Sequence, residues 1–387
     1  MEPISSPIFP SITRPALLIN AEQCRANIAR MALKARAAGS TGTDVVFRPH
    51  FKTHQSAQIA EWFRAEGMEA CTVSSVAMAE YFADYGWSDI TIAFPVNPRE
   101  LPAIDLLAER VEHLHLLVES VETVEQMRET LTYPVNVWIK IDCGYHRTGI
   151  AYDNTALLTK VAKAVQSSPL LTLRGLLSHF GDSYHCQGKA QLSEHYHASL
   201  RNLQKARLAL GVQGITRPDQ KLLLSIGDTP SCSLVDDLGE IDEMRPGNFV
   251  FYDSQQLAIG SCTAEEISAA LACPIVALHP ERGEVIIHGG AIHLSKDTCA
   301  TPEHPVSYGL PALPTETGWS APIAGGWVRS LSQEHGIVCL PPEVLSTLQV
   351  GDLLMILPAH SCLTLQAMAY AYTLEDRRID TLLTEGY

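Results

Sequence analysis

Two hydrophobic periods alternate along the first two-thirds of the chain. Short apolar runs that suit buried strands recur at residues 44–47, 70–74, 90–94, 114–118, 135–141, 173–178, 222–226 and 248–252. Amphipathic stretches with a helical period lie between most of them, for example residues 56–67, 75–86, 120–131 and 189–210. Because strands buried on both faces form continuous apolar runs, these eight units predict an α/β fold, a (β/α)8 TIM-type barrel.

A doubly wound open sheet is the competing architecture for such a rhythm. No Gly-x-Gly-x-x-Gly motif follows the first run to support it. After residue 256 the pattern changes to short β-type runs between Pro, Gly and charged turns, at 273–280, 284–290, 336–340 and 352–358. The sequence therefore predicts a barrel domain at 15–255 and a smaller β-rich C-terminal domain at 256–387, and leaves open whether residues 1–14 join the latter.

Composition narrows the classes of function. The chain has 387 residues, of which 46% are hydrophobic, and a formal net charge of -15. An acidic surface repels phosphates, so nucleic acids and membrane surfaces are poor partners. No apolar run reaches the ~18 residues that span a membrane, and we expect no signal peptide at the N-terminus. Ten cysteines without a Cys-x-x-Cys pair favour reduced thiols in a cytoplasmic protein.

A lysine in the segment RPHFKTHQ, residues 48–55, is the first candidate for chemistry. In a parallel barrel the catalytic groups lie at the carboxyl ends of the strands, and Lys52 follows the first apolar run. A lysine in a partly apolar setting has a lowered pKa and can act as a neutral nucleophile that forms a Schiff base. A solvated turn lysine is the alternative explanation.

Other polar residues follow later runs and are expected at the same rim. Arg147 follows the fifth run, and His179 and Tyr184 follow the sixth. The loops after strands 7 and 8 of such barrels commonly bind phosphate. These two loops correspond to SIGDTPS, residues 225–231, whose Gly, Thr and Ser can present N–H groups and hydroxyls, and to MRPGNF, residues 244–249. Simple tight turns are the alternative explanation for the glycines.

The segment PAHSCLT, residues 358–364, has a histidine and a cysteine two residues apart. In an extended segment, the side chains of His360 and Cys362 would point the same way. Imidazole plus thiolate is a borderline-soft pair that suits Zn²⁺. Two protein ligands do not close a structural site, so a metal here would keep positions open for water or substrate. A chance His-x-Cys pair is the alternative.

Four segments of the chain resemble the fold-type III pyridoxal-phosphate enzymes. The resemblance is closest to the group of D-serine dehydratase and D-threonine aldolase, whose barrel is shared with alanine racemase. The segments are RPHFKTH, KIDCGYHRTG, MRPGNFVFYD and PAHSCLT, and the similarity covers nearly the whole chain. It implies pyridoxal 5'-phosphate as the cofactor, a small D-amino acid as the substrate, and a homodimer.

The resemblance also implies roles for the candidate residues. Lys52 would bind the cofactor and His179 would lie against its ring. Further cofactor contacts would come from Tyr184, Arg147 and Arg245. The phosphate would be held by Ser225, Gly227, Thr229 and the backbone of Gly247 and Asn248. Zn²⁺, or another divalent metal, would be bound by His360 and Cys362.

The activity implied by the resemblance is a metal-dependent lyase that removes water from a D-3-hydroxy amino acid, giving a keto acid and ammonia. In the family's usual pattern aldolases carry His-x-Asp at the metal position and dehydratases carry His-x-Cys, so Cys362 favours the dehydratase. The alternatives are a D-threonine aldolase type of C–C lyase, an amino-acid racemase, and a cofactor-binding protein without turnover. The metal-bearing domain argues against the last. The sequence does not indicate which D-3-hydroxy amino acid is the substrate.

Overall fold

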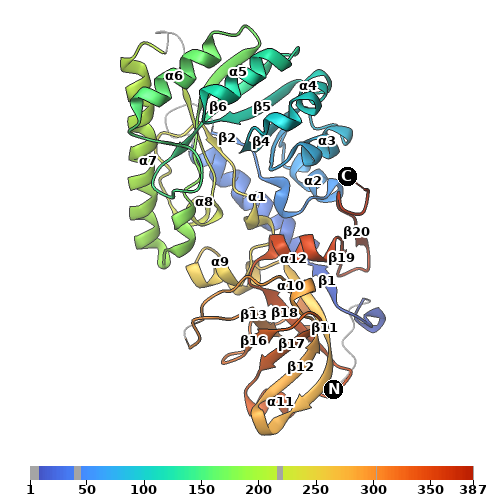
Figure 1. The fold of residues 1–387 in the computed structure, drawn as a ribbon. Helices are drawn as coiled ribbons and strands as arrows, with labels where there is room; N and C mark the ends of the chain where they lie inside the picture. Colours follow the sequence, from blue (N-terminus) through green and yellow to red (C-terminus); the bar gives the residue numbers. More distant parts are fainter. Residues whose placement is uncertain (1–7, 39–44, 216–220, 302, 387) are drawn as a thin grey trace. The chain divides into compact units, whose positions relative to one another are not determined.

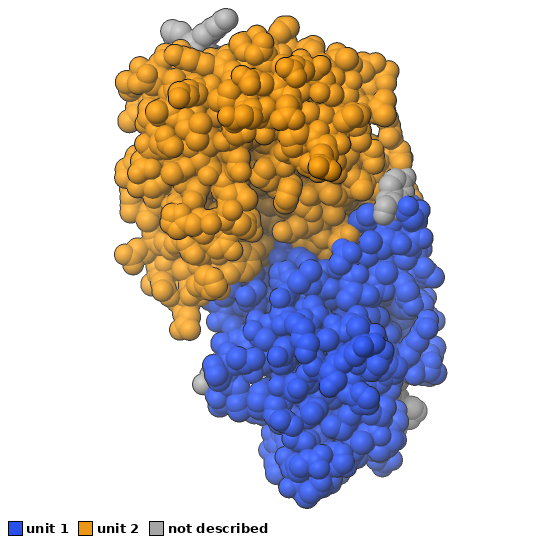
Figure 2. All heavy atoms as spheres, viewed as in Figure 1, with its two compact units in different colours: residues 1–29, 248–386 blue, residues 30–247, 387 orange. Residues whose placement is uncertain are grey.

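The computed structural model describes residues 8–38, 45–215, 221–301 and 303–386. They belong to two compact units, one of residues 30–247 and one that combines residues up to 29 with residues 248–386 (Figure 2). The units divide inside helix α1 (Ala21–Ala38) and after Gly247, whereas the sequence placed the domain limits at residues 15 and 255.

Eight parallel strands form the barrel of the unit 30–247 (Figure 1). In spatial order they are β2 (Val46–Phe47), β10 (Glu243–Met244), β9 (Leu223–Ile226), β8 (Leu171–Leu177), β6 (Val135–Asp142), β5 (His113–Val118), β4 (Asp89–Pro95) and β3 (Ala70–Val73). A parallel bridge between His50 and Thr72 joins the two ends of this row, so the barrel is nearly closed. The short strand β7 (Ile150–Ala151) pairs with β6. The predicted barrel is therefore confirmed.

Helices follow the barrel strands and surround them (Figure 1). They are α2 (Ala57–Ala65), α3 (Val76–Asp84), α4 (Leu101–Arg110), α5 (Val121–Thr130), α6 (Thr155–Gln166), α7 (Gly188–Val212) and α8 (Thr229–Leu234). Three of them begin after a serine, Ser56, Ser75 or Ser120, whose hydroxyl accepts a hydrogen bond from the backbone N–H three residues later. Such caps satisfy donors that a helix start leaves unpaired.

One predicted strand is wrong. The apolar pattern predicts a strand at 248–252, but Asn248–Val250 form a buried 3-10 helix, η5. The eighth barrel strand is β10 instead, and the pattern missed it because it has only two residues and begins with the buried carboxylate Glu243. At the other end, residue 44 of the predicted run 44–47 lies outside the described residues.

A mostly antiparallel sheet forms the second unit, which confirms the predicted β-rich C-terminal domain. Its strand β11 (Ala269–His279) pairs antiparallel with β1 (Ala16–Ile19), β12 (Glu284–His288) and β18 (Leu353–Pro358). The sheet is completed by β13 (Gly309–Ala312), β16 (Trp327–Leu331), β17 (His335–Cys339), β19 (Ala371–Thr373) and β20 (Arg378–Ile379). A separate hairpin joins β14 (Pro314–Thr315) and β15 (Gly318–Trp319). The helices of this unit are α9 (Ser254–Ile259), α10 (Ala291–Leu294), α11 (Pro342–Leu345) and α12 (Ser361–Met368).

Besides η5, the described residues contain the 3-10 helices η1 (Phe9–Ser11), η2 (Phe51–Thr53), η3 (Pro98–Glu100), η4 (Gly181–His185), η6 (Ala264–Glu266) and η7 (Pro280–Arg282). Leu117, Trp138 and Leu177 form a fully buried cluster, with Leu223 packed against it. These residues come from four neighbouring barrel strands, so side chains fill this part of the barrel. Within the described ranges, no helix is both long enough and apolar enough to cross a membrane.

Candidate active site

Lys52 lies beyond the carboxyl end of β2, in the turn η2. Its neighbours Phe51 and Thr53 are fully buried, whereas Lys52 is exposed. Phe51 packs against Phe63 with 5.1 Å between ring centroids, and the Nδ1 atom of His50 accepts a hydrogen bond from the backbone N–H of Lys52 at 3.4 Å. The core therefore holds the backbone of this turn, while the lysine side chain stays accessible.

Several positive groups gather around Lys52. Burial lowers the pKa of His50 well below its usual value, and the nearby charges of Lys52, Arg245 and His179 lower it further. Burial also lowers the pKa of His179 to about 3, with a contribution from Arg147 and Lys52. Lys52 thus influences both imidazoles, Arg245 influences that of His50, and Arg147 influences that of His179. These three cations come from separate segments and favour an anionic ligand, whereas the two imidazoles are neutral near pH 7.

The ring of His179 follows β8 and is held by a carbonyl group. Its Nδ1 atom donates a hydrogen bond to the carbonyl oxygen of Gly227 at 2.7 Å, so the neutral ring carries no proton on Nε2. The rings of Tyr184 and Tyr145 lie beside it, each with a centroid separation of 6.2 Å. The guanidinium carbon of Arg147 lies 5.2 Å from the ring centroid of Tyr145. Tyr145 therefore connects Arg147 to His179.

Two glycines after β9 and β10 allow the backbone to approach closely. A Cβ atom on Gly227 would lie 2.8 Å from the backbone of Arg245, and one on Gly247 would lie 2.6 Å from the carbonyl oxygen of His50. Beside them, Thr229 begins α8 with 1% of its surface exposed. Among the described residues, its Oγ1 atom has no hydrogen-bond partner. A buried hydroxyl without a partner, next to two glycine turns, fits a bound phosphate.

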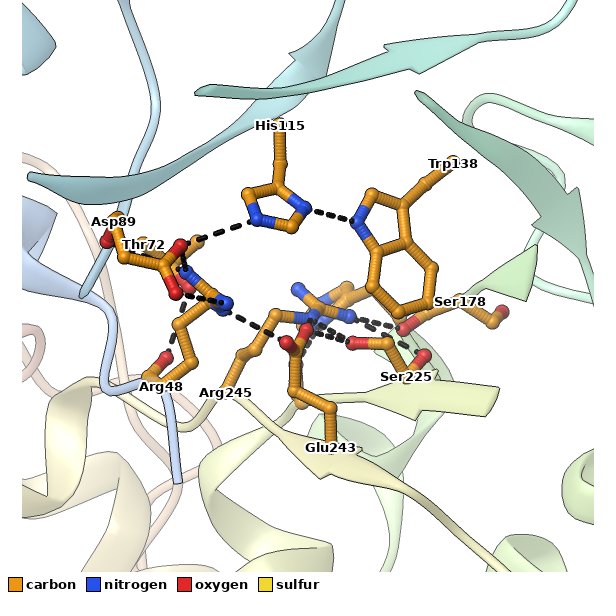
Figure 3. A network of polar contacts seen from close by, with 11 residues as sticks. Arg48, Thr72, Asp89, His115, Trp138, Ser178, Ser225, Glu243 and Arg245 are labelled. Atoms are coloured by element: carbon orange, nitrogen blue, oxygen red, sulfur yellow. Dashed lines mark hydrogen bonds and ion pairs between the residues drawn. The ribbon is translucent and has the colours of Figure 1, made fainter. Parts of the chain in front are cut away.

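Arg245 is buried and is anchored inside the barrel (Figure 3). Its Nε atom donates to Oγ of Ser225 at 2.6 Å, and its Nη2 atom donates to the carbonyl oxygen of Ser178 at 2.9 Å. The hydroxyl of Ser225 in turn donates to Glu243 at 2.6 Å. Because that hydroxyl has only one hydrogen, Ser225 has none left for a phosphate and positions Arg245 instead.

Glu243 continues this network toward β4, β5 and β6 (Figure 3). It accepts a hydrogen bond from Nε of Arg48 at 2.7 Å, and Nη2 of Arg48 donates to Asp89 at 3.1 Å. His115 lies 3.1 Å from Asp89 through Nε2, and its Nδ1 atom accepts from the indole N–H of Trp138 at 3.1 Å. Burial alone would raise the pKa of Glu243, but the charges of Arg48 and Arg245 together with the hydrogen bond from Ser225 outweigh burial and lower that pKa. The buried charges are thus paired, as low-dielectric surroundings require.

His360 and Cys362 lie at the start of α12, in the unit with the β-rich sheet. The extended segment expected here is wrong, because His360 caps the helix and Cys362 is its second residue. The two side chains nevertheless form a hydrogen bond. Burial alone would lower the pKa of His360, but the negative charges of Cys362 and Asp253 raise it to about 9.

The buried carboxylate of Asp253 organises this pair. Its Oδ2 atom lies 3.6 Å from Nδ1 of His360 and accepts hydrogen bonds from the N–H of Ser361 at 3.0 Å and the amide of Asn248 at 2.7 Å. The same amide nitrogen lies 3.7 Å from Sγ of Cys362. A metal-bound histidine usually turns its other ring nitrogen toward a carboxylate or carbonyl group. The arrangement therefore fits a metal at Nε2 of His360 and Sγ of Cys362.

The donor set of this pair also bears on the kind of metal site. Within the part of the chain that the structure describes, no third His, Cys, Asp or Glu joins His360 and Cys362 in a group whose ligand atoms all lie within 4.8 Å of one another. A metal held by one imidazole and one thiolate would keep open positions, which is the property of a catalytic site.

Sequence reasoning missed Tyr145, Lys140 and Asp253, and it favoured an ordinary hydrogen-bonded role for the fourth residue, His50. Lys140 is buried near Arg245, and burial lowers its pKa to about 8. All four lie inside or beside the segments that carry the family resemblance. Position in those segments was the available signal, but nothing in the sequence separates these residues from their neighbours.

Comparisons with known proteins identify relatives along nearly the whole chain. The sequence profile described as "Alanine racemase, N-terminal domain" matches residues 19–255, and the one described as "Putative serine dehydratase domain" matches residues 268–374. A D-threo-3-hydroxyaspartate dehydratase of Delftia sp. (strain HT23) is 29% identical over 380 residues, which cover 96% of this chain and 97% of the relative. A D-serine dehydratase of Dictyostelium discoideum is 27% identical over 381 residues, 92% of this chain and 91% of the relative.

A solved structure of a D-threo-3-hydroxyaspartate dehydratase is similar to this chain along nearly its whole length. It has a TM-score of 0.85 at 27% identity and covers 96% of this chain and 98% of that chain. The protein in that structure is a cysteine-to-alanine mutant in the metal-free form.

Proposed function

Because the chain belongs to the alanine racemase N-terminal domain family and carries a serine dehydratase domain, we propose that it is a pyridoxal-phosphate- and metal-dependent lyase that eliminates water from a D-3-hydroxy amino acid. Loss of water followed by hydrolysis gives a keto acid and ammonia. The product would be pyruvate from D-serine and oxaloacetate from D-threo-3-hydroxyaspartate.

The observation that carries this proposal is the position of Lys52. An accessible lysine on a buried turn at the end of β2, close to His179 and Arg245, is what a cofactor aldehyde needs. The same rim offers the unpaired Oγ1 of Thr229 and the close turns at Gly227 and Gly247 for the phosphate. Bound pyridoxal phosphate would supply an electron sink for charge that develops at Cα.

Each residue at the rim then has a proposed task. The amine of Lys52 would hold the cofactor and would later take the Cα proton as the general base. His179 would lie against the ring, and Arg245 would be kept in place by Ser225. Arg147 and Tyr184 would be further cofactor contacts. The phosphate would be held by Gly227, Thr229 and the backbone N–H groups of Gly247 and Asn248.

The unit with the β-rich sheet would supply the metal. His360 and Cys362 would bind Zn²⁺, since an imidazole nitrogen and a thiolate match its softness. A cysteine-to-alanine mutant of a related D-threo-3-hydroxyaspartate dehydratase was solved in a metal-free form, which supports a cysteine ligand here. A bound Zn²⁺ would act as a Lewis acid that stabilises the departing hydroxyl group.

We further propose a homodimer in the cytoplasm that takes a small D-amino acid and binds neither nucleic acids nor membranes. Among the described residues no two of the ten cysteines form a disulfide, and nine of the ten are buried, which suits a reducing compartment. The formal charge of -15 disfavours phosphate-rich partners. Light scattering of the purified protein measures the mass of the assembly, and a monomeric mass would contradict the dimer.

The proposed activity is tested by product analysis. The protein, loaded with pyridoxal phosphate and Zn²⁺, is incubated separately with D-serine, D-threo-3-hydroxyaspartate, D-threonine and L-serine. We expect keto acid and ammonia from one or more of the D-amino acids, no product from L-serine, and loss of the activity with a chelator. Glycine and acetaldehyde from D-threonine would identify an aldolase instead, and inversion at Cα would identify a racemase.

Variants of two lysines test the role of Lys52. Lys52→Ala should abolish turnover and the visible absorbance of the lysine-bound cofactor. Lys160→Ala, which changes an exposed lysine on α6, should leave both unchanged. Full activity of Lys52→Ala would contradict the proposal.

A further inference from the structure

Three potential metal ligands lie together in the β-rich unit, on elements that carry neither His360 nor Cys362. His288 ends β12, His293 lies on α10, and Glu334 lies between β16 and β17. Their ligand atoms all lie within 4.8 Å of one another. The Oε2 atom of Glu334 is 3.5 Å from Nε2 of His288 and 3.9 Å from Nε2 of His293.

The backbone around this cluster is closely packed, which fixes the three side chains relative to one another. The N–H of Gly289 donates to the carbonyl oxygen of Glu334 at 2.9 Å, and the N–H of Ala291 donates to that of Ser332 at 2.8 Å. A Cβ atom on Gly290 would lie 2.3 Å from the carbonyl oxygen of Gln333, so only glycine allows this approach. The start of α10 is therefore held against the turn that carries Glu334.

These distances and donors fit one kind of ion. Ligand atoms about 2.0–2.2 Å from a tetrahedral zinc lie roughly 3.4 Å from one another, which is close to the 3.5 Å and 3.9 Å observed. Two imidazoles and one carboxylate form a donor set that zinc enzymes use, with the fourth position left to water. The side chains are exposed by 38% for His288, 13% for His293 and 47% for Glu334, so an ion can enter from solvent.

We propose that His288, His293 and Glu334 form a second zinc site, independent of the metal at His360 and Cys362 and of the lyase activity. The fourth ligand is water or a small anion. Binding through Nε2 of His293 moves the ring proton to Nδ1. The Gly290 N–H, which donates to Nδ1 at 3.2 Å, then loses that acceptor. This exchange lowers the affinity for zinc without changing the ligand set.

The decisive experiment counts zinc in a chain whose other site is disabled. Full-length Cys362→Ala protein is stripped with a chelator and dialysed against Zn²⁺, and bound zinc is measured by mass spectrometry. We expect this protein to keep one zinc per chain. Adding Glu334→Gln, which preserves side-chain volume, or His293→Ala should raise the dissociation constant at least about tenfold, since even loss of a supporting contact costs 10- to 100-fold.

A matched control is available in the same unit. Nδ1 of His279 lies 3.5 Å from Oε1 of Glu281. Among the described residues, no third potential metal ligand joins this histidine–carboxylate pair. His279→Ala in the Cys362→Ala chain should leave zinc binding unchanged. The proposal is overturned if the Cys362→Ala chain binds no zinc, or if Glu334→Gln and His293→Ala bind it as tightly as their parent. Because the readout is bound zinc, a missing lyase activity would overturn the proposed function and not this site.

Discussion

Replacing Asp253 by asparagine tests whether a buried carboxylate prepares His360 and Cys362 for metal. Asparagine keeps the size of the side chain and the Oδ1 atom, which caps α9 by accepting from the N–H of Gln256 at 3.0 Å. It replaces Oδ2, the acceptor for Asn248 and Ser361, by an NH2 group. Donors would then face donors, and the negative charge beside His360 would be lost.

The structure sets the size of the expected effect. The backbone N–H of Ser361 loses its acceptor, and one unpaired buried donor costs about 1–3 kcal/mol. The amide of Asn248 loses less, because it also donates to Oγ of Ser361 at 3.0 Å. We therefore expect a loss of about 1–3 kcal/mol in the free energy of unfolding. Without the carboxylate that orients His360, metal affinity should fall about 10- to 100-fold.

Competition between the protein and a coloured chelator measures this affinity without any turnover, in chains that all carry Glu334→Gln so that the second proposed site does not contribute. The control variant is Asp105→Asn, because Asp105 also accepts three hydrogen bonds, from the N–H and hydroxyl of Thr132 and the N–H of Tyr133, but lies on α4 in the barrel unit. It should lose stability and keep its metal affinity. Equal affinity in Asp253→Asn and the parent protein would refute the reasoning, because the carboxylate would then do nothing for the metal ligands.

Three further substitutions distinguish effects on cofactor binding at the barrel rim from effects on stability in the protein interior. Gly247→Ala places a Cβ atom 2.6 Å from the carbonyl oxygen of His50, and overpacking of about 1–3 kcal/mol should weaken pyridoxal-phosphate binding about 5- to 150-fold by fluorescence titration. The control Gly86→Ala, at a φ of +78° with nothing within 4 Å, should lose stability through backbone strain but keep its affinity for the cofactor. Glu243→Gln removes the negative charge that pairs with the buried Arg48 and Arg245. The free energy of unfolding, measured with urea, should fall by about 3–5 kcal/mol. Buried His54 and His179 have pKa values of about 3, against 6.5 in the unfolded chain, so only the unfolded state takes up their protons between these values. The free energy of unfolding should then fall as the pH drops below about 6.5, by up to roughly 1.4 kcal/mol per pH unit for each histidine, and His54→Leu should make this dependence shallower.

The parts of the fold that were predictable from sequence are those with a local signal. Seven of the eight apolar runs coincide with barrel strands, because a strand buried on both faces must be apolar along its length. The exception is the run 248–252. It is as apolar as a buried strand, but its first three residues are buried in the 3-10 helix η5, and hydrophobicity alone does not distinguish a buried strand from a buried helix.

The residues that support the site could not be predicted because their partners are distant in sequence. Arg48 meets Glu243 across 195 positions, and Asp253 meets Ser361 across 108. A buried carboxylate is tolerated only when such a partner is present, so no single segment reveals it. Lys52, by contrast, was predicted because it closely follows the apolar run 44–47. The residues proposed to contact the ligands are thus predictable from motifs, whereas those that orient them require the folded chain. Glu243, which lies just outside the segment MRPGNFVFYD, is therefore a position where a substitution can change the site while all four motifs stay intact.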